Sequence, residues 1–586
     1  MRIGVFVCHC GSNIEGTVDT AAVAREALTF PEVVMATDSM YACSEPGQDA
    51  IIQAIREKDL SGVVVASCTP RMHEPTFRRT VERAGLNRYL FEMANIREHV
   101  SWIGKDREAN TNKAAELVLM AVEKLRRNIP LYANQFDINK RVLIIGGGVA
   151  GIQAALDCAE GGLEVVLVER ESTIGGKMAK LDKTFPTVDC SSCILGPKMV
   201  DVAQHPKIKL LAYSEVHQIS GYIGNFQVEV RRKATYVDWD KCTGCGLCME
   251  KCPSKKAMDR FNERMGTTTA INIPFPQAIP KKAVIDPSSC RQFLKGKCGV
   301  CARVCTTGAI NFQMTDEIVT ESVGTIIAAT GFDLFDIKNC GEYGGGRYPD
   351  VITSLQYERL LSASGPTGGH IRRPSDGAEP KSVVFVQCVG SRDKSLDRPY
   401  CSGFCCMVTA KQAILTRDHI PDSQSYVFYM DIRAPGKLYD EFIRRAIEAY
   451  GAHYIRGRVS MIYPRNGKYV VRGADTLLGA PVEVEADLVV LAAGAEAAVG
   501  ASALAEKLRI SYDRFGFFME SHPKLRPVET NTAGIYLAGA CQGPKDIPAS
   551  VGQGSAAAAK VLGLLSKEKL ESDPQISRVD VKRCVG

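Results

Sequence analysis

Two short runs of cysteines have the spacing of iron–sulfur ligands. The first run, CTGCGLCMEKCP, has the pattern C-x2-C-x2-C-x3-C-P, and the second has gaps of seven, two and three residues between its cysteines. In bacterial ferredoxins the fourth cysteine of such a run ligates the other cluster. Four-cysteine zinc sites also use a two-residue gap, but the duplicated runs and the trailing proline favour iron. We predict two [4Fe–4S] clusters, one held by Cys242, Cys245, Cys248 and Cys305 and the other by Cys290, Cys298, Cys301 and Cys252.

A third group of cysteines lies where the expected strand KSVVFVQCVG ends and the next helix begins. Its spacing, C-x12-C-x3-C-C, places an adjacent pair of cysteines at the start of that helix. Buried free cysteines are the alternative, but such a pair with two further cysteines nearby is unusual as core filling. We predict a third [4Fe–4S] cluster held by Cys388, Cys401, Cys405 and Cys406.

A fourth group lies in the first segment of the chain, which alternates expected strands such as RIGVFVC and SGVVVASC with helical patterns. The carboxyl ends of parallel strands lie at one edge of a sheet, so cysteines at these ends could converge. Scattered buried cysteines are the alternative. Cys190 or Cys193, in VDCSSCILGPK, could lend a ligand across the domain boundary. We predict a cluster held by Cys8, Cys10, Cys43 and Cys68.

A dinucleotide-binding fingerprint, GGGVAG, follows the apolar strand RVLII. Here Gly146 would make the tight turn, Gly148 would let a pyrophosphate approach, and Gly151 would let helix and strand pack. The pyrophosphate would lie at the helix N-terminus, where free N–H groups favour negative charge. Glu169 ends the second strand and is placed to accept a hydrogen bond from a ribose. We therefore predict a bound dinucleotide.

Later segments favour FAD over NAD. STIGGK follows the acid of the second strand, and YLAGACQGPKDIPASVGQG resembles the segment that closes over the ribityl chain in disulfide-reductase-like flavoproteins. The usual Gly-Asp of those proteins is Gly539-Ala540 here, so their ribityl contact must come from elsewhere, and the following helix start could supply N–H groups. The predicted FAD site therefore also includes Gly176, Lys177, Gly539, Ala540, Ile547 and Ser550.

The second half of such flavoproteins binds NAD(P)H through another glycine fingerprint. The corresponding strand here, VVFVQCVGSRD, keeps only Gly390, and Cys388 occupies the turn, so we expect the pyridine-nucleotide site to be lost. Lys411 lies five residues after Cys406 in the expected helix beside the predicted cluster. We hypothesise that its ammonium donates a hydrogen bond to flavin N5 and stabilises the anionic reduced flavin. A solvated surface lysine is the alternative.

Length and composition fit a globular protein of several domains. The chain has 586 residues, of which 45% are hydrophobic and 24% charged, and its net charge is +6. The absence of a long basic block argues against nucleic acid, and the absence of an apolar stretch of about 18 residues argues against a membrane span. Its start, MRIGVFVCHCG, is unlike a signal peptide. We therefore expect the 22 cysteines to be mainly thiolate ligands in a cytoplasmic protein.

The order of expected elements predicts an α/β fold of the disulfide-reductase (thioredoxin reductase) type with an inserted two-cluster ferredoxin domain. The predicted segments are an N-terminal α/β domain with cysteines (1–133), the opening portion of the FAD domain (134–234), the ferredoxin insert (235–315), the continuation of the FAD domain with a loop (316–379), a degenerate NAD-like domain carrying a cluster (380–494), the closing portion of the FAD domain (495–570) and the start of a truncated ferredoxin module (571–586).

With these residues in view, the whole chain resembles the A subunit of heterodisulfide reductase. The motifs that carry the resemblance include VCHCG, SCTPRMHEPTFRR, PTVDCSSCILGPKM, QCVGSRD…YCSGFCC and GPKDIPASVGQGSAAAA. The resemblance implies FAD and about four [4Fe–4S] clusters, in an anaerobic electron-transfer complex such as those of methanogenesis. It also implies electron bifurcation or confurcation, in which the flavin splits electron pairs between a disulfide-reducing branch and low-potential ferredoxin.

The resemblance implies partners as well. They are the disulfide-reducing subunits, a hydrogenase or formate dehydrogenase as electron donor, ferredoxin and a second copy of the chain. A C-terminal ferredoxin module of the family would begin within VDVKRCVG, so we do not expect Cys584 to be a ligand.

Other functions compete with this one. An NAD(P)H-dependent flavoprotein reductase, similar to the small subunit of glutamate synthase, is one alternative, although the missing second glycine fingerprint counts against it. A related electron-relay component of a sulfate- or aromatic-reduction complex is another. A third is a relay scaffold whose clusters mainly stabilise the fold.

Overall fold

The computed structural model describes residues 1–577 and 579–586. They form two compact units. The N-terminal unit comprises Met1–Phe136 and Glu571–Gly586, and the central unit comprises Asp137–Leu570. The N-terminal unit has one parallel β-sheet and the central unit has two, and each unit has its own buried core.

The N-terminal unit is built on one parallel sheet. Its strands are, in sheet order, β2 (Val33–Ser39), β1 (Ile3–Cys8), β3 (Gly62–Ser67) and β4 (Phe91–Asn95). Its helices are α2 (Thr20–Ala27) and α5 (Arg107–Leu125) on one face, and α3 (Glu45–Glu57) and α4 (Pro70–Arg83) on the other. Because helices cover both faces, β1 and β3 are buried along their whole length. Asp106 is the N-cap of α5, where its carboxylate accepts the N–H groups of Glu108 and Ala109.

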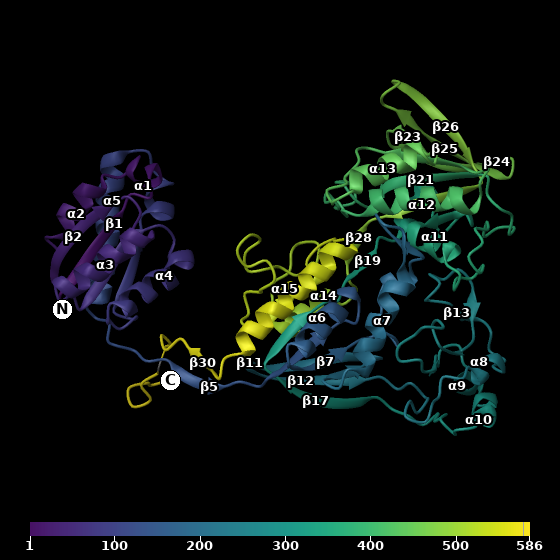
Figure 1. Cartoon of the computed structure of the whole chain (residues 1–586), viewed down its shortest axis with the longest axis horizontal. Helices are drawn as coiled ribbons and strands as arrows, with labels where there is room; N and C mark the ends of the chain where they lie inside the picture. Colours follow the sequence, from purple (N-terminus) through teal and green to yellow (C-terminus); the bar gives the residue numbers. More distant parts are fainter. Residues whose placement is uncertain (578) are drawn as a thin grey trace. The chain divides into compact units, whose positions relative to one another are not determined.

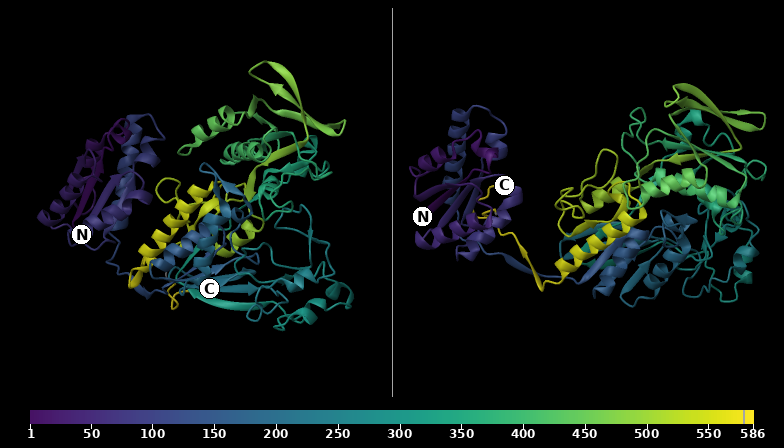
Figure 2. Two further views of the ribbon diagram at one scale, coloured as in Figure 1. Left: turned by 45° about the vertical axis from the view of Figure 1, so that its right-hand side comes forward. Right: turned by 45° about the horizontal axis from the view of Figure 1, so that its top comes forward.

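The central unit contains a first parallel sheet that carries the glycine fingerprint. Its strands are, in sheet order, β10 (Ile208–Leu211), β7 (Glu164–Val168), β6 (Arg141–Ile145), β18 (Thr325–Ala328) and β29 (Ile535–Leu537). Helices α6 (Val149–Glu160) and α15 (Ile547–Leu565) run side by side on one face (Figures 1 and 2). The other face packs against an antiparallel sheet of β11 (Ser214–Tyr222), β12 (Asn225–Arg232) and β17 (Glu317–Val323).

A second parallel sheet in the same unit has a similar build. Its strands are, in sheet order, β20 (Val351–Thr353), β27 (Leu488–Ala493), β21 (Ser382–Val389), β22 (Gln424–Tyr429) and β23 (His453–Arg456). Helices α11 (Ser354–Leu361) and α12 (Cys405–His419) contact one face, and α13 (Tyr439–Glu448) packs on α12. The other face meets an antiparallel sheet of β24 (Val459–Arg465), β25 (Lys468–Asp475) and β26 (Ala480–Ala486).

The inserted segment between β12 and β17 is made of short elements. They are the strand pairs β13 (Ala257–Met258) with β14 (Thr267–Thr268) and β15 (Ile271–Asn272) with β16 (Val284–Ile285), and the helices α8 (Leu247–Glu250), α9 (Arg291–Lys295) and α10 (Val300–Val304). Cysteines form part of its small buried core, together with aliphatic side chains. Such a core is small for an independent domain, and bound clusters would add the missing stability.

Several short elements connect these layers. They are α1 (Ser12–Glu15), the π-helix η1 (Arg97–Ser101), β5 (Asn134–Asp137), β8 (Lys183–Thr184) paired with β9 (Asp189–Cys190), α7 (Ser191–Gln204), β19 (Phe332–Leu334) paired with β28 (Ala495–Ala497), α14 (Ala501–Leu508), β30 (Lys569–Ser572) and the 3-10 helices η2 (Met178–Lys180), η3 (Ile337–Asn339), η4 (Gly341–Tyr343) and η5 (Gly539–Cys541).

The predicted α/β architecture is confirmed, with an N-terminal α/β unit and a segment inserted between β12 and β17 of the central unit. The finer division into seven segments stays a prediction. Among the described residues, no helix has the length and apolar character needed to cross a membrane.

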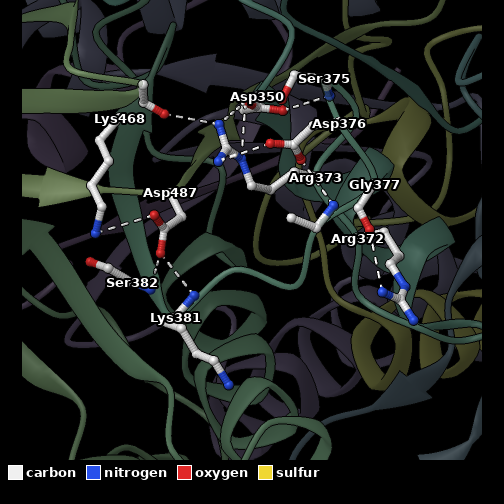
Figure 3. Close-up of polar contacts among 12 residues, drawn as sticks. Asp350, Arg372, Arg373, Ser375, Asp376, Gly377, Lys381, Ser382, Lys468 and Asp487 are labelled. Atoms are coloured by element: carbon white, nitrogen blue, oxygen red, sulfur yellow. Dashed lines mark hydrogen bonds and ion pairs between the residues drawn. The ribbon is translucent and has the colours of Figure 1, made fainter.

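The loop rich in glycine, proline and serine before β21 is held by hydrogen bonds to two buried carboxylates, those of Asp350 and Asp487 (Figure 3). The Asp350 side chain is fully buried, and it accepts hydrogen bonds from the Arg373 guanidinium (3.0 Å) and from the N–H and hydroxyl groups of Ser375 (2.9 and 2.7 Å). Asp487 accepts the N–H groups of Lys381 and Ser382 at the other end of the loop. The loop is therefore a fixed part of the second sheet's edge.

Replacing Asp350 with alanine should destabilise this edge strongly. It leaves the Arg373 guanidinium, whose side chain is 15% exposed, without its buried partner, and breaking such a pair costs about 3–5 kcal/mol. The matched control is Asp376→Ala, because Asp376 pairs with the same guanidinium at 3.2 Å but is 49% exposed; it should cost less than about 1 kcal/mol. Chemical denaturation of the two variants checks this, and equal losses would contradict it.

Candidate functional site

A cavity of about 550 Å³ lies at the carboxyl ends of strands β6, β7, β18 and β29. In open α/β folds this edge of the sheet is where ligands bind. Gly151 and Gly539, two of the predicted flavin residues, pack just behind its wall. The others line the cavity, namely Gly146, Gly148, Glu169, Gly176, Lys177, Ala540, Ile547 and Ser550.

The three fingerprint glycines meet different surroundings. Gly146 has φ +113°, and a Cβ there would lie 2.4 Å from the carbonyl oxygen of Ala329. A Cβ on Gly151 would lie 1.9 Å from the carbonyl oxygen of Gly146, so any side chain would force the helix away from the turn. A Cβ on Gly148 would have no atom within 4 Å. Gly148 therefore leaves open the space that a pyrophosphate would occupy.

Glu169 holds the glycine turn in place. Its carboxylate accepts the N–H of Gly147 at 2.7 Å and the N–H of Glu171 at 2.8 Å. Burial raises the pKa of Glu169, while these two N–H groups oppose the rise. A ribose hydroxyl donating to the same carboxylate would further offset its burial, so the residue fits the role predicted for it.

Two helices begin at the cavity. Gly148 is the N-cap of α6, and Asp546 is the N-cap of α15, where its carboxylate accepts the N–H of Ala549 at 2.9 Å. Ile547 and Ser550 lie in the first turn of α15. Because the N-terminal end of a helix carries partial positive charge, both helix starts suit a ligand with negative charge. The residues present therefore fit a dinucleotide such as FAD.

Substituting Gly148 with alanine should release FAD without unfolding the protein. The new methyl group would meet no protein atom and would fill space in the cavity instead. We expect FAD affinity to fall at least about tenfold, which corresponds to about 1.4 kcal/mol. Flavin content after extraction and the thermal midpoint measure the two effects.

The matched control is Gly552→Ala in α15. This position also has open space around its would-be Cβ but does not line the cavity, so FAD content should stay at the wild-type level. Full FAD retention in the Gly148 variant would contradict the assignment of the pyrophosphate position.

The inserted segment supplies a further wall of the same cavity. Phe261 and Phe275 line the cavity and stack on each other with ring centroids 4.5 Å apart. Met258 and Asp286 from the same segment also line it. No local pattern indicates this contact, because the insert and the glycine fingerprint are about a hundred positions or more apart along the chain. The ferredoxin-type segment is therefore built onto the predicted flavin site.

Several charged cavity residues were not named in the sequence analysis, and two of them, Lys545 and Glu358, are distinguished by their burial. Lys545 lines the cavity beside the N-cap of α15, and burial lowers the pKa of its ammonium. Glu358, on α11, also lines the cavity although its side chain is only 1% exposed. Lys545 directly precedes the N-cap Asp546, and this position could have indicated that it lines the cavity. No local sequence pattern indicates that Glu358 does.

Lys411 does not line the cavity but lies one residue behind it. Its side chain is 1% exposed, and its ammonium is 2.8 Å from the Glu358 carboxylate and donates to the carbonyl oxygen of Lys183 at 2.6 Å. The alternative of a solvated surface lysine is therefore wrong. The hydrogen bond to flavin N5 stays a prediction, and Glu358 lies between the ammonium and the cavity.

The structure brings the third group of cysteines together beside the cavity. Cys388 ends β21 in a left-handed conformation with φ +60°, and Cys405 and Cys406 begin α12. Burial raises the pKa of Cys388 to about 11, and the nearby thiols of Cys406 and Cys401 add to the rise. Buried thiols with raised pKa values need a cation to exist as thiolates, which fits a cluster of iron ions.

The two residues that flank this cysteine pair are cavity residues. Phe404 precedes Cys405, and Val408 lies two residues after Cys406; both line the cavity. The cysteine pair and the cavity are therefore separated by less than one helical turn of α12.

The insert places one predicted ligand set around a common space. Cys252, Cys290, Cys298 and Cys301 all line a cavity of about 10 Å³ inside the insert. For the other set, burial raises the pKa of Cys248 to about 11, with Cys242 and Cys245 near enough to add to the rise. Helix α10, which ends one residue before Cys305, packs against α8, which carries Cys248.

The N-terminal group also converges at the carboxyl edge of its sheet. Cys8 lies near Cys10 and Cys43, and burial raises the pKa of Cys68 to about 11, with Cys10 and Cys8 adding to the rise. The guanidinium of Arg97, in the π-helix η1, donates to the sulfur of Cys10 at 3.5 Å. Short π-helical segments are often found at functional sites.

Cys190 and Cys193 form a disulfide, so neither is a free thiolate in this structure. Within the residues that the structure describes, no three His, Cys, Asp or Glu side chains are arranged to hold a single metal ion. A cluster of four irons separates its thiolates more widely than one ion does. Cys584 is exposed.

Iron content should distinguish the ligand groups. Four clusters imply roughly 16 iron atoms per chain, at four irons each. Cys388→Ser should lower the content by about four irons. Cys340→Ser is the control, because Cys340 is a buried free cysteine that belongs to none of the groups, and its iron content should match wild type. Iron near half of the expected value in the wild-type protein would leave only the insert's clusters, and substantial zinc would count against iron.

Comparison with known proteins agrees with this site. Residues 141–188 match the FAD dependent oxidoreductase family, and residues 235–255 match the 4Fe-4S binding domain family. An iron–sulfur A subunit of the CoB–CoM heterodisulfide reductase of Methanopyrus kandleri is 53% identical over all of this chain and 89% of its own length.

The A subunit of the H2:CoB–CoM heterodisulfide,ferredoxin reductase of Methanothermobacter marburgensis is 50% identical over all of this chain and 88% of its own length. Among solved structures, the thioredoxin reductase of T. acidophilum aligns with 72% of this chain and 98% of its own, at 15% identity and a TM-score of 0.40.

Proposed function

The chain belongs to the family of heterodisulfide reductase A subunits, and we propose that it splits electron pairs at a bound FAD. It is an oxidoreductase that carries FAD and [4Fe–4S] clusters. FAD accepts electrons in pairs and can release them singly, whereas each [4Fe–4S] cluster carries one electron at a time. The chain's own contribution is to hold these groups close together and to exclude other reactions.

The observation that carries the proposal is the position of the Cys388 group against the cavity. Phe404 and Val408 line the cavity while Cys405 and Cys406 lie between them on the same helix turn. A cluster held there would be in position to take single electrons from the flavin. The insert, with its own predicted clusters, lines another wall and gives a second direction of transfer. Electron splitting requires two separate acceptors, each of which takes one electron from the same flavin.

Partners are proposed from the same family. The names of relatives refer to H2, ferredoxin and the CoB–CoM heterodisulfide. For this chain we propose a hydrogenase or formate dehydrogenase as donor, disulfide-reducing subunits as one acceptor branch, ferredoxin as the other, and a second copy of the chain within the complex. The proposed ligands and flavin contacts are those predicted from the sequence.

An NAD(P)H-dependent reductase is the alternative function. Against it stands the turn after β21, where the left-handed residue is Cys388 and the next left-handed residue is Gly390. A Cβ on Gly390 would lie 2.1 Å from the Phe335 ring, so this glycine serves close packing. Bleaching of the flavin by NADPH in the isolated protein would favour the alternative.

The proposal is tested on the complex that co-purifies with the chain under anaerobic conditions. The complex is given H2 or formate together with ferredoxin and a heterodisulfide of two thiols. We expect both acceptors to be reduced in equal electron amounts, and ferredoxin reduction to stop when the disulfide is omitted. Ferredoxin reduction at an unchanged rate without the disulfide would refute electron splitting.

Lys411→Ala should shift the flavin potentials and impair electron splitting while FAD and iron content stay intact. An ammonium that reached about 4 Å from an anionic flavin would be worth up to about 4 kcal/mol before desolvation is subtracted. Its pairing with Glu358 at 2.8 Å would reduce this value. The control is Lys437→Ala, because Lys437 is exposed and has no role in the cavity. An anaerobic redox titration measures the potentials, and equal values for both variants and wild type would contradict a role at the flavin.

A further inference from the structure

We propose that Cys190 and Cys193 form a reversible redox switch that acts on the flavin cavity. The two cysteines are joined by a disulfide, both are exposed, and neither is one of the sixteen cysteines in the four predicted ligand sets. This inference goes beyond electron splitting and does not depend on it. It rests on the disulfide itself and on a continuous set of contacts from it to the cavity wall.

The disulfide has the features of a reactive rather than a structural bond. It joins cysteines only three positions apart, so it closes a short loop, for which the entropic stabilisation of the fold is smallest. Both cysteines are at the surface, where attacking thiols can reach them, and exposed disulfides are generally the labile ones. A disulfide kept only for stability would be expected deeper in the protein and across a longer loop.

The local structure also favours its reduction. Cys190 is the N-cap of α7, and its sulfur accepts the N–H of Cys193 at 3.3 Å. Helix α7 runs from Ser191 to Gln204, so its N-terminal end presents a full helix dipole to the Cys190 sulfur. Cysteine thiolates at helix N-termini have lowered pKa values and are good leaving groups.

The first connection to the cavity runs through the β8–β9 pair. Cys190 pairs with Lys183 across the two strands. The carbonyl oxygen of Lys183 accepts the Lys411 ammonium at 2.6 Å, and that ammonium is 2.8 Å from the Glu358 carboxylate. Glu358 lines the cavity. Each step is one direct contact. A movement of the Cys190 backbone would therefore move Lys183, whose carbonyl oxygen accepts the hydrogen bond from Lys411.

The second connection runs through Ser191, which lies between the two cysteines. Its buried hydroxyl donates to the carbonyl oxygen of Met178 at 2.7 Å, and its N–H donates to that of Asp182 at 2.9 Å. Met178 lines the cavity, and the N–H of Asp182 donates to the Glu358 carboxylate at 3.2 Å. Both connections therefore end on the same cavity wall.

The switching step needs a dithiol reductant. One of its thiolates attacks the Cys193 sulfur, so the Cys190–Cys193 bond breaks and Cys190 leaves as a thiolate held by the N–H groups of α7. The second thiol of the reductant then attacks the mixed disulfide and releases Cys193. The reductant becomes a disulfide, and the two cysteines gain two electrons and two protons. A disulfide oxidant reverses the step.

Breaking the bond removes the covalent link between Cys190 and Cys193 at the start of α7. The two-residue strands β8 and β9 then lose a covalent support at the position where Lys183 pairs with Cys190. Because the carbonyl oxygen of Lys183 accepts a hydrogen bond from the Lys411 ammonium, reduction should shift the positions of Lys411 and Glu358 relative to the flavin. The bound flavin should therefore have different potentials in the two states.

The experiment uses the anaerobically purified holoprotein. It is equilibrated with defined ratios of reduced and oxidised dithiothreitol, the free thiols are blocked with an alkylating agent, and the peptide containing Cys190 and Cys193 is analysed by mass spectrometry. We expect reversible conversion between a disulfide form and a form carrying two alkyl groups. The flavin midpoint potential is then measured for the locked oxidised and locked alkylated proteins, and we expect a shift between them.

Three variants sharpen the result. In Cys190→Ser/Cys193→Ser the same treatment should leave the flavin potential unchanged, and iron and FAD content should equal those of wild type. Cys584→Ser, which removes another exposed cysteine, should behave as wild type. In a Lys411→Ala background the shift between the two locked states should shrink.

Loss of iron in the double variant would mean that these cysteines are cluster ligands and would overturn the proposal. So would a peptide that stays in one form across the whole range of ratios, or conversion without any shift in flavin potential. None of these outcomes depends on electron splitting, which is tested separately with the two acceptors.

Discussion

The ion pair between Glu358 and Lys411 is the constraint on which the central unit depends. Both side chains are 1% exposed, and burying two charges costs several kcal/mol unless their remaining hydrogen-bonding groups are satisfied. Here they are satisfied by Gln412, whose amide donates to Glu358 at 2.6 Å, by the N–H of Asp182, and by the carbonyl oxygen of Lys183. The pair is stable only while α11, α12 and the β8 segment keep these positions.

This ion pair links α12 to α11, and the first turn of α12 carries residues of the site. With Lys411 held against Glu358, the first turn of the helix carries Cys405 and Cys406 while Phe404 and Val408 line the cavity. The helix also packs through Met407 and Ala410 on α13, which fixes its rotation about its axis. The buried charge pair and the packing on α13 thus both contribute to placing Cys405 and Cys406 beside the cavity.

The glycine fingerprint, the acid that ends β7 and the cysteine groups could be predicted from sequence because each depends on spacing within one element and its neighbour. Contacts between distant segments could not. Phe261 and Phe275 line the cavity from the insert, and Glu358 comes from α11, yet neither follows a local pattern. The burial of Lys411 could not be predicted either, because the sequence around a helical lysine does not show whether that face of the helix is solvated or packed against another element.

The two parallel sheets of the central unit show how one framework can hold different chemistry. At the end of β6 the left-handed residue is Gly146, and a Cβ there would strike Ala329, so the turn stays tight and the fingerprint's second glycine leaves space for phosphate. At the end of β21 the left-handed residue is Cys388, which accepts the strain of a side chain at φ +60°. That strain is tolerable when the side chain gains a strong bond, as an iron ligand does. The end of β21 therefore has a cysteine at the left-handed position where the end of β6 has a glycine, which fits the cluster predicted for the Cys388 group rather than a second nucleotide site.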